Sequence, residues 1–83
     1  MGDKKIGEIV HYFSGINVGI IKLTDSLEVG EKIRVVGGED TDFTQEITSM
    51  EVEHEKIEKA KKGQEVGIKL EGKVREGYEV YKV

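Results

Sequence analysis

The sequence of 83 residues contains no cysteine, no proline and no tryptophan. The absence of cysteine excludes disulfides and thiolate-held zinc, and it makes a cytoplasmic localisation the expected one. The longest apolar run, Val18–Ile21, is far too short to span a bilayer, and Met1–Lys5 has no apolar stretch behind it. We therefore expect no membrane association. The net charge of −4 also argues against a protein held to nucleic acid by bulk charge.

The apolar residues that are present favour strands. Val and Ile supply 19 of the 30 apolar residues, and 11 glycines provide many tight turns. A chain of this length forms one domain, and closing the sheet into a barrel is the simplest way to remove its edges. We predict a single all-β domain over residues 1–83: a small closed antiparallel β-barrel of six to seven strands, preceded by a flexible tail over residues 1–5.

Hydrophobic alternation sets the expected elements. Strands are predicted at Ile6–Phe13, Val18–Leu23, Lys32–Val36, Phe43–Glu53, Gln64–Glu71 and Tyr78–Val83. The inward phase shifts within Phe43–Glu53, which indicates a bulge near Thr48–Ser49. A short helical or turn segment is expected over 54–62, where Glu55 with Lys59 and Glu58 with Lys62 form favourable i,i+4 pairs.

Glycine stands just before a predicted strand or apolar stretch at three places, Gly30, Gly63 and Gly77. Each predicts a tight turn with positive φ, followed by a strand whose first apolar residue enters the core.

Four segments in order, Gly7–Val10, Val18–Leu23, Leu27–Ile33 and Gly63–Ile68, resemble the second domain of translational GTPases such as elongation factor Tu, and Gly72–Gly77 continues the match. A short protein of this kind resembles the small translation elongation factor-like proteins. The resemblance implies a closed barrel and a role connected to translation, with RNA or ribosomal components as partners. In those factors this barrel helps to hold the aminoacylated end of tRNA: Glu51 keeps one contact position, whereas His54 replaces an arginine and Glu65 replaces an asparagine. A carboxylate repels phosphate and cannot donate a hydrogen bond, so the resemblance implies a pocket that is only partly present and does not favour tRNA binding.

The sequence has no P-loop, so neither nucleotide binding nor GTP hydrolysis is expected, and no cofactor is predicted. Catalysis is not expected either: Ser14, Ser26 and Ser49 have no paired base, and a barrel this small fills its own interior. No metal site is predicted, because Glu39, Asp40 and Asp42 lack the spacing of a calcium loop. His11 and His54 would form at best a weak or catalytic-type site with Glu51, Glu53 or Glu55 as a third ligand, and His54 is more simply a surface residue.

Two groups of residues are candidate partner contacts. The basic group consists of Lys56, Lys59, Lys61, Lys62, Lys73 and Arg75, and it either contacts RNA phosphates or forms a solvated face paired with Glu55 and Glu58. The aromatic group, His11 and Tyr12 with Phe13, either stacks on unpaired bases, anchors a protein partner or packs at the core edge.

The leading hypothesis is a non-catalytic binding module associated with translation or RNA. The alternative is a protein-interaction or accessory module without RNA contact, which the acidic net charge favours. Glu and Lys supply 24 residues, whereas Asn and Gln supply three, a bias typical of proteins from hot environments.

Overall fold

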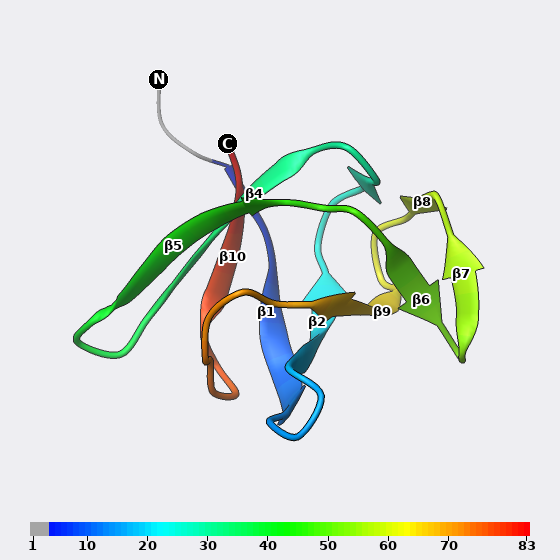
Figure 1. Ribbon diagram of the computed structural model, residues 1–83. Helices are drawn as coiled ribbons and strands as arrows, with labels where there is room; N and C mark the ends of the chain where they lie inside the picture. The colour runs from blue at the N-terminus through cyan, green and yellow to red at the C-terminus, as the bar shows by residue number, and fades with distance from the viewer. Residues whose placement is uncertain (1–3) are drawn as a thin grey trace.

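The computed structural model describes residues 4–83 as a chain of short strands, with no helix among these residues (Figure 1). The strands are β1 (Lys4–Phe13), β2 (Val18–Leu23), β3 (Leu27–Glu28), β4 (Lys32–Gly37), β5 (Thr41–Glu46), β6 (Met50–Val52), β7 (Glu55–Ile57), β8 (Lys59–Ala60), β9 (Glu65–Lys69) and β10 (Glu79–Lys82). The prediction of an all-β domain is confirmed.

Eight strands form one antiparallel sheet in the order β5-β4-β10-β1-β2-β9-β6-β7, and β3 pairs with β8 in a separate two-stranded sheet. The long strand β1 lies near the middle, between β10 and β2 (Figure 1). Within residues 4–83, β5 and β7 stand at the two ends of the ladder and do not pair with each other. Closure into a barrel is therefore not confirmed.

The core follows from the alternation in the sequence. Along β2, Gly19, Ile21 and Leu23 are buried, and β9 buries Val66 and Ile68 in the same way. Two branches at Cβ suit this packed, pleated surface. The buried apolar cluster is Ile6, Ile9, Ile21, Leu23, Leu27, Ile33, Val35, Ile47, Met50, Ala60, Val66, Ile68, Leu70, Val74 and Val80.

The three predicted glycine turns are confirmed. Gly30, Gly63 and Gly77 have φ of 97°, 92° and 94°. In each turn the residue after the glycine donates its backbone N–H to the carbonyl three residues earlier, at 3.1–3.2 Å. Positive φ at the third position of a four-residue turn selects glycine, and the three turns lead into β4, β9 and β10.

Other boundaries differ from the predictions. The segment 54–62 begins and ends in turn residues, His54 and Lys62, but between them it contains β7, a bend at Glu58 and β8, so the helical form of the predicted helical or turn segment is wrong. The i,i+4 pairs are worth only about 0.2–0.5 kcal/mol each, less than the burial of Ile57 and the pairing of β8 with β3. Residues 47–49 divide the predicted strand Phe43–Glu53 into β5 and β6, at the place where we expect a bulge within one strand. Of the predicted tail over 1–5, Lys4 and Lys5 lie in β1, and residues 1–3 lie outside the described part.

A buried glutamine joins the two halves of the sheet. The Gln45 side chain on β5, only 7% exposed, donates Nε2–H to the Lys69 carbonyl at 2.9 Å. Its Oε1 accepts the backbone N–H of Glu71 at 2.8 Å. These two bonds connect an end strand of the sheet to the last residue of β9 and to Glu71 just after it, where backbone pairing does not.

The β4–β5 hairpin carries a two-pronged ion pair on its surface. Arg34 donates to both carboxylate oxygens of Asp42, at 2.8 and 2.6 Å, and this hydrogen bonding holds the pKa of Asp42 below its ordinary value. The Asp42 carboxylate is thus occupied by a guanidinium. Across residues 4–83, no group of three acidic or imidazole side chains is arranged to hold a metal ion.

No helix long and apolar enough to cross a membrane occurs in the part of the chain that the structure describes.

Candidate functional site: a groove on the outer face of the sheet

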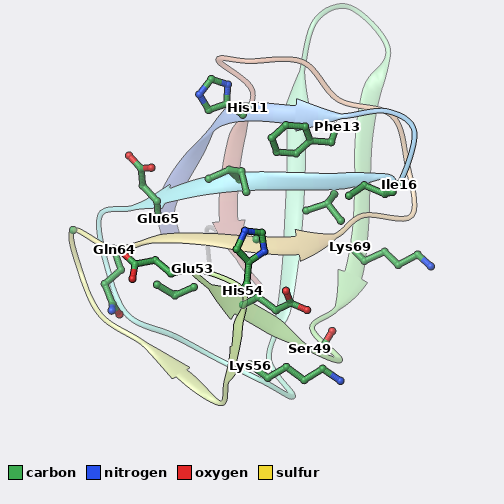
Figure 2. A pocket seen from close by; sticks show the side chains of 16 residues that line it. His11, Phe13, Ile16, Ser49, Glu53, His54, Lys56, Gln64, Glu65 and Lys69 are labelled. Atoms are coloured by element: carbon green, nitrogen blue, oxygen red, sulfur yellow. The ribbon is translucent and has the colours of Figure 1, made fainter.

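A groove of about 930 Å³ lies on the outer face of β1, β2, β9 and β6, beside the β6–β7 hairpin (Figure 2). It combines apolar, acidic, basic and imidazole side chains. The residues that line it are His11, Phe13, Ile16, Val18, Ile20, Ser49, Glu51, Val52, Glu53, His54, Lys56, Gly63, Gln64, Glu65, Gly67 and Lys69.

A bulge in β1 brings two aromatic rings to this groove. Ile9 is buried, so strict alternation would also bury His11. The register between β1 and β2 shifts between Ile9 and His11, and beyond the shift His11 and Phe13 point outward. Such an insertion re-aims the following side chains. The bulge therefore places Phe13, half exposed at 50%, along one wall of the groove.

The floor is apolar and contains a gap. On β2, Val18 and Ile20 point outward and are half-buried, while Ile21 and Leu23 point inward. Gly67 on β9 pairs with Ile20 on one side and with Glu51 on the other. Because Gly67 has no side chain, the sheet surface is lowered there between its neighbours, which leaves room for a guest side chain.

A strained turn forms the other side of the groove. Glu53 and His54 connect β6 to β7 as a two-residue hairpin loop, and their φ values are 52° and 67°. Two consecutive positive φ values define the turn that normally selects Asn-Gly, and residues with a Cβ pay about 1–2 kcal/mol each. Both side chains line the groove, and Figure 2 shows His54 standing in front of β9. Strain retained at a cleft is a known mark of functional surfaces.

Charge is separated along the groove. The outward positions of β9 are Glu65, Gly67 and Lys69, and Figure 2 shows the carboxylate and the ammonium at opposite ends. Glu51 on β6 lies beside Gly67, with Lys56 as its cross-strand partner. Among residues 4–83, neither Glu65 nor Lys69 has an ion-pair partner within 4.0 Å. Both side chains are exposed; Lys22 on β2 is the cross-strand neighbour of Glu65, and Val18 is that of Lys69.

His11 is held at the rim by its neighbours. Its Nδ1 lies 3.3 Å from a carboxylate oxygen of Glu76, and its ring stacks on Phe13 with centroids 6.4 Å apart and planes at 25°. Both His11 and Glu76 are well exposed, so the pair orients the ring more than it stabilises the fold.

The structure brings together only some of the residues predicted to contact a partner. Glu51, His54, Glu65, His11 and Lys56 all line the groove. Tyr12 is instead half-buried against the core and donates its hydroxyl to Asn17 Oδ1 at 3.1 Å.

The remaining basic residues do not line the groove, and two of them lie far from Lys56. Lys59, Lys61, Lys62, Lys73 and Arg75 are exposed and lie outside the groove lining. The connection between β9 and β10, which carries Lys73 and Arg75, lies on the opposite side of the molecule from β7 and β8 (Figure 1).

Sequence reasoning missed the apolar part of the groove, namely Ile16, Val18, Ile20 and Gly67. One signal was present. Val18–Leu23 carries apolar residues on both phases of the alternation, which predicts a strand with an apolar outer face as well as an apolar inner face.

These features define a class of protein: a small all-β domain with a charged and apolar groove on its outer face. The fold is shared with the C-terminal domain of a putative U32 peptidase of Geobacillus thermoleovorans. One crystal structure of that domain, a selenomethionine variant, has a TM-score of 0.90 and 18% identity, and the match covers 95% of this chain and 99% of that one. For a second crystal structure of the domain the TM-score is also 0.90, with 96% and 92% covered.

A sequence match points the same way. The chain is 36% identical over 77 residues to the uncharacterized protease MJ0090 of Methanocaldococcus jannaschii. The match covers 93% of this chain but 19% of that protease, so the chain spans about a fifth of its curated relative. No protein-family model matches the chain.

These findings overturn the resemblance to the second domain of translational GTPases. The relatives are a protease and a peptidase domain, so the predicted role in translation or RNA metabolism is wrong. The segments that carried the resemblance are glycine turns and Val/Ile strands, which are requirements of a small antiparallel fold and carry no family-specific chemistry.

Proposed function

We propose that this protein is a non-catalytic accessory domain of the kind found in U32-type peptidases, and that it binds unfolded polypeptide in the outer-face groove. The observation that carries the proposal is the extent of the sequence match. Nearly the whole chain corresponds to a fifth of a protease, and four-fifths of that protease lies outside the match. We infer that the chain acts as a part of such a protein and that hydrolysis is carried out outside it.

The groove supports a binding role. It has half-exposed apolar walls, a floor lowered at Gly67, and two charged ends without ion-pair partners among residues 4–83. Its volume of about 930 Å³ holds several amino-acid side chains. Polypeptide substrates of a peptidase supply both apolar side chains and charges.

Two finer points belong to the same proposal. We infer that the sheet curls toward a partly open barrel, because Gln45 on β5 bonds the segment after β9. A cytoplasmic localisation is consistent with a chain that has no cysteine.

The test measures binding and cleavage together. We expect the protein to bind fluorescently labelled, unfolded casein and to release no labelled peptides from it on prolonged incubation. Cleavage that co-purifies with the protein and is lost on groove substitution would contradict the non-catalytic assignment.

A turn variant separates binding from folding. Replacing both turn residues, Glu53→Asn with His54→Gly, relieves the positive-φ strain and is expected to raise stability by about 1–2 kcal/mol. The same change removes two groove side chains and should weaken casein binding. Thermal unfolding and casein titration of one preparation give both readouts. A variant that is more stable and binds casein as tightly as the parent places the binding surface elsewhere.

A further inference from the structure

The three outward-facing residues of β9 differ in their chemistry. Glu65, Gly67 and Lys69 present a carboxylate, a gap and an ammonium at every second residue. Residues four apart in a strand are about 13 Å apart, and an extended peptide lying alongside has the same repeat. An extended peptide that contacts all three positions therefore needs complementary side chains at every second residue.

The gap is built for an apolar side chain. A Cβ placed on Gly67 would lie 3.4 Å from Ile20 Cδ1 and 3.5 Å from Val18 Cγ1, which are ordinary contact distances. A guest side chain entering the gap thus meets two aliphatic groups. Phe13 pairs with Val18 on the adjacent strand and extends this apolar surface.

The two ends are charged in opposite senses. Glu65 is at one end of the groove, with Lys22 on β2 as its cross-strand partner, and Glu51, beside Gly67 and opposite Lys56, adds a second carboxylate to the lining; neither carboxylate forms an ion pair within 4.0 Å among residues 4–83. Lys69 stands at the other end, in the row of Phe13 and Val18. A ligand with a positive charge, an apolar group and a negative charge in that order matches all three.

We propose that the groove binds an extended polypeptide segment with a basic, an apolar and an acidic side chain at alternate positions. The apolar side chain lies over Gly67, the basic one faces Glu65, and the acidic one faces Lys69. This assignment rests on the proposed function and adds the sequence class of the bound polypeptide.

The experiment uses three labelled peptides in fluorescence anisotropy at low ionic strength. The first is Lys-Ser-Leu-Ser-Glu, the second replaces its Glu with Lys, and the third replaces its Leu with Ser; each is flanked by Gly-Ser. The unmodified protein is expected to prefer the first peptide over the second by about five- to tenfold, because an attraction at Lys69 becomes a repulsion. It should bind the third at least about tenfold more weakly, because the apolar contact is lost.

Charge reversal at the protein provides the matched test. Lys69→Glu should invert the preference, so that the peptide with two lysines binds better than the first. Lys73→Glu is the control: it makes the same change on an exposed residue outside the groove and should leave the preference as it was. A Lys69→Glu protein that still prefers the first peptide overturns the charge assignment.

Filling the gap over Gly67 tests whether the apolar side chain of the peptide binds there. Gly67→Val introduces a strand-favouring residue where φ is not positive and where the new Cβ would lie no closer than 3.4 Å to another atom, and thermal unfolding measures whether its two further methyl groups are accommodated. Binding of the first peptide should fall at least about tenfold. Gly67→Ala repeats the test if valine lowers the stability. A folded variant that binds the first peptide as tightly as the parent does would contradict the placement of the apolar side chain over Gly67.

The outcomes distinguish an error in the sequence class of the bound peptide from an error in the proposed function. If casein binds in the groove and all three peptides bind equally or not at all, the sequence class is wrong and the proposed function stands. If neither casein nor any peptide binds, both fail. Self-association in analytical ultracentrifugation that Gly67→Val abolishes would identify a second copy of the chain as the occupant and overturn the assignment.

Discussion

Replacing Gly7 with alanine is expected to lower the free energy of unfolding by about 3 kcal/mol, a large fraction of the roughly 4–12 kcal/mol available to a domain of this length. Gly7 lies within β1, paired with Leu23 on β2 and Val80 on β10. An added Cβ would lie 2.6 Å from the Lys22 carbonyl oxygen and 2.8 Å from Ile21 Cγ2. The carbonyl is a backbone atom in the centre of the sheet, so no rotamer change relieves the contact.

Gly15→Ala is the matched control for this prediction. Gly15 lies in the turn between β1 and β2, has no positive φ, and a Cβ there would meet nothing within 4 Å. Its stability should be unchanged or rise by about 0.4–1 kcal/mol, because alanine restricts the unfolded chain. Urea denaturation of the two variants and the parent measures the difference. Equal midpoints for the two alanine variants would show that β1 does not approach β2 as described.

The second large effect is expected at Gln45, the buried amide that links β5 to the end of β9 and to Glu71 just after it. Gln45→Ala leaves the Lys69 carbonyl and the Glu71 N–H without their side-chain partner. An unsatisfied buried group costs about 1–3 kcal/mol, so a total loss of about 2–4 kcal/mol is expected. At about 4–8 °C per kcal/mol for a domain of this size, the melting temperature should fall by at least about 10 °C.

Two further variants isolate the hydrogen bonds. Gln45→Leu keeps most of the side-chain volume and removes both polar atoms, so it should lose nearly as much stability as the alanine variant. Glu46→Ala changes the exposed neighbour on β5 and should stay within about 0.5 kcal/mol of the parent. A Gln45→Leu protein as stable as the parent would mean that packing, and not the amide bridge, holds β5 in place.

The sequence predicts the strands well where alternation is strict and turn chemistry is specific. The Val18–Leu23 strand has the predicted bounds, and the three turns at Gly30, Gly63 and Gly77 have the predicted positive φ. In these segments local preference and tertiary packing favour the same structure, so the local pattern is sufficient.

The β6–β7 hairpin could not be predicted in the same way. Its turn is Glu53–His54, which lacks the glycine that normally marks a two-residue loop, and the residues after it have the charge spacing of a helix. Pairing of β6 with β9 and of β8 with β3 outweighs that local preference. These contacts join residues that lie far apart in the sequence, and no local pattern encodes them.

The groove depends on register, which the sequence does not display. The bulge after Ile9 decides that His11 and Phe13 point outward, and the pairing of Gly67 with Ile20 and Glu51 places the gap between β2 and β6. Five of the predicted contact residues line the groove, among them Lys56, whereas Lys59, Lys61, Lys62, Lys73 and Arg75 do not line it.

The central claim is that polypeptide binds in the groove on the outer face of β1, β2, β9 and β6. The most direct test is a titration of the ¹⁵N-labelled protein with the peptide Lys-Ser-Leu-Ser-Glu, followed by amide chemical shifts. We expect saturable shifts that centre on Phe13, Ile20, Glu51, Gly67 and Lys69, with the β4–β5 hairpin unaffected. Saturable shifts that centre on that hairpin, or on the segment between β9 and β10, with the groove amides unmoved, would contradict it.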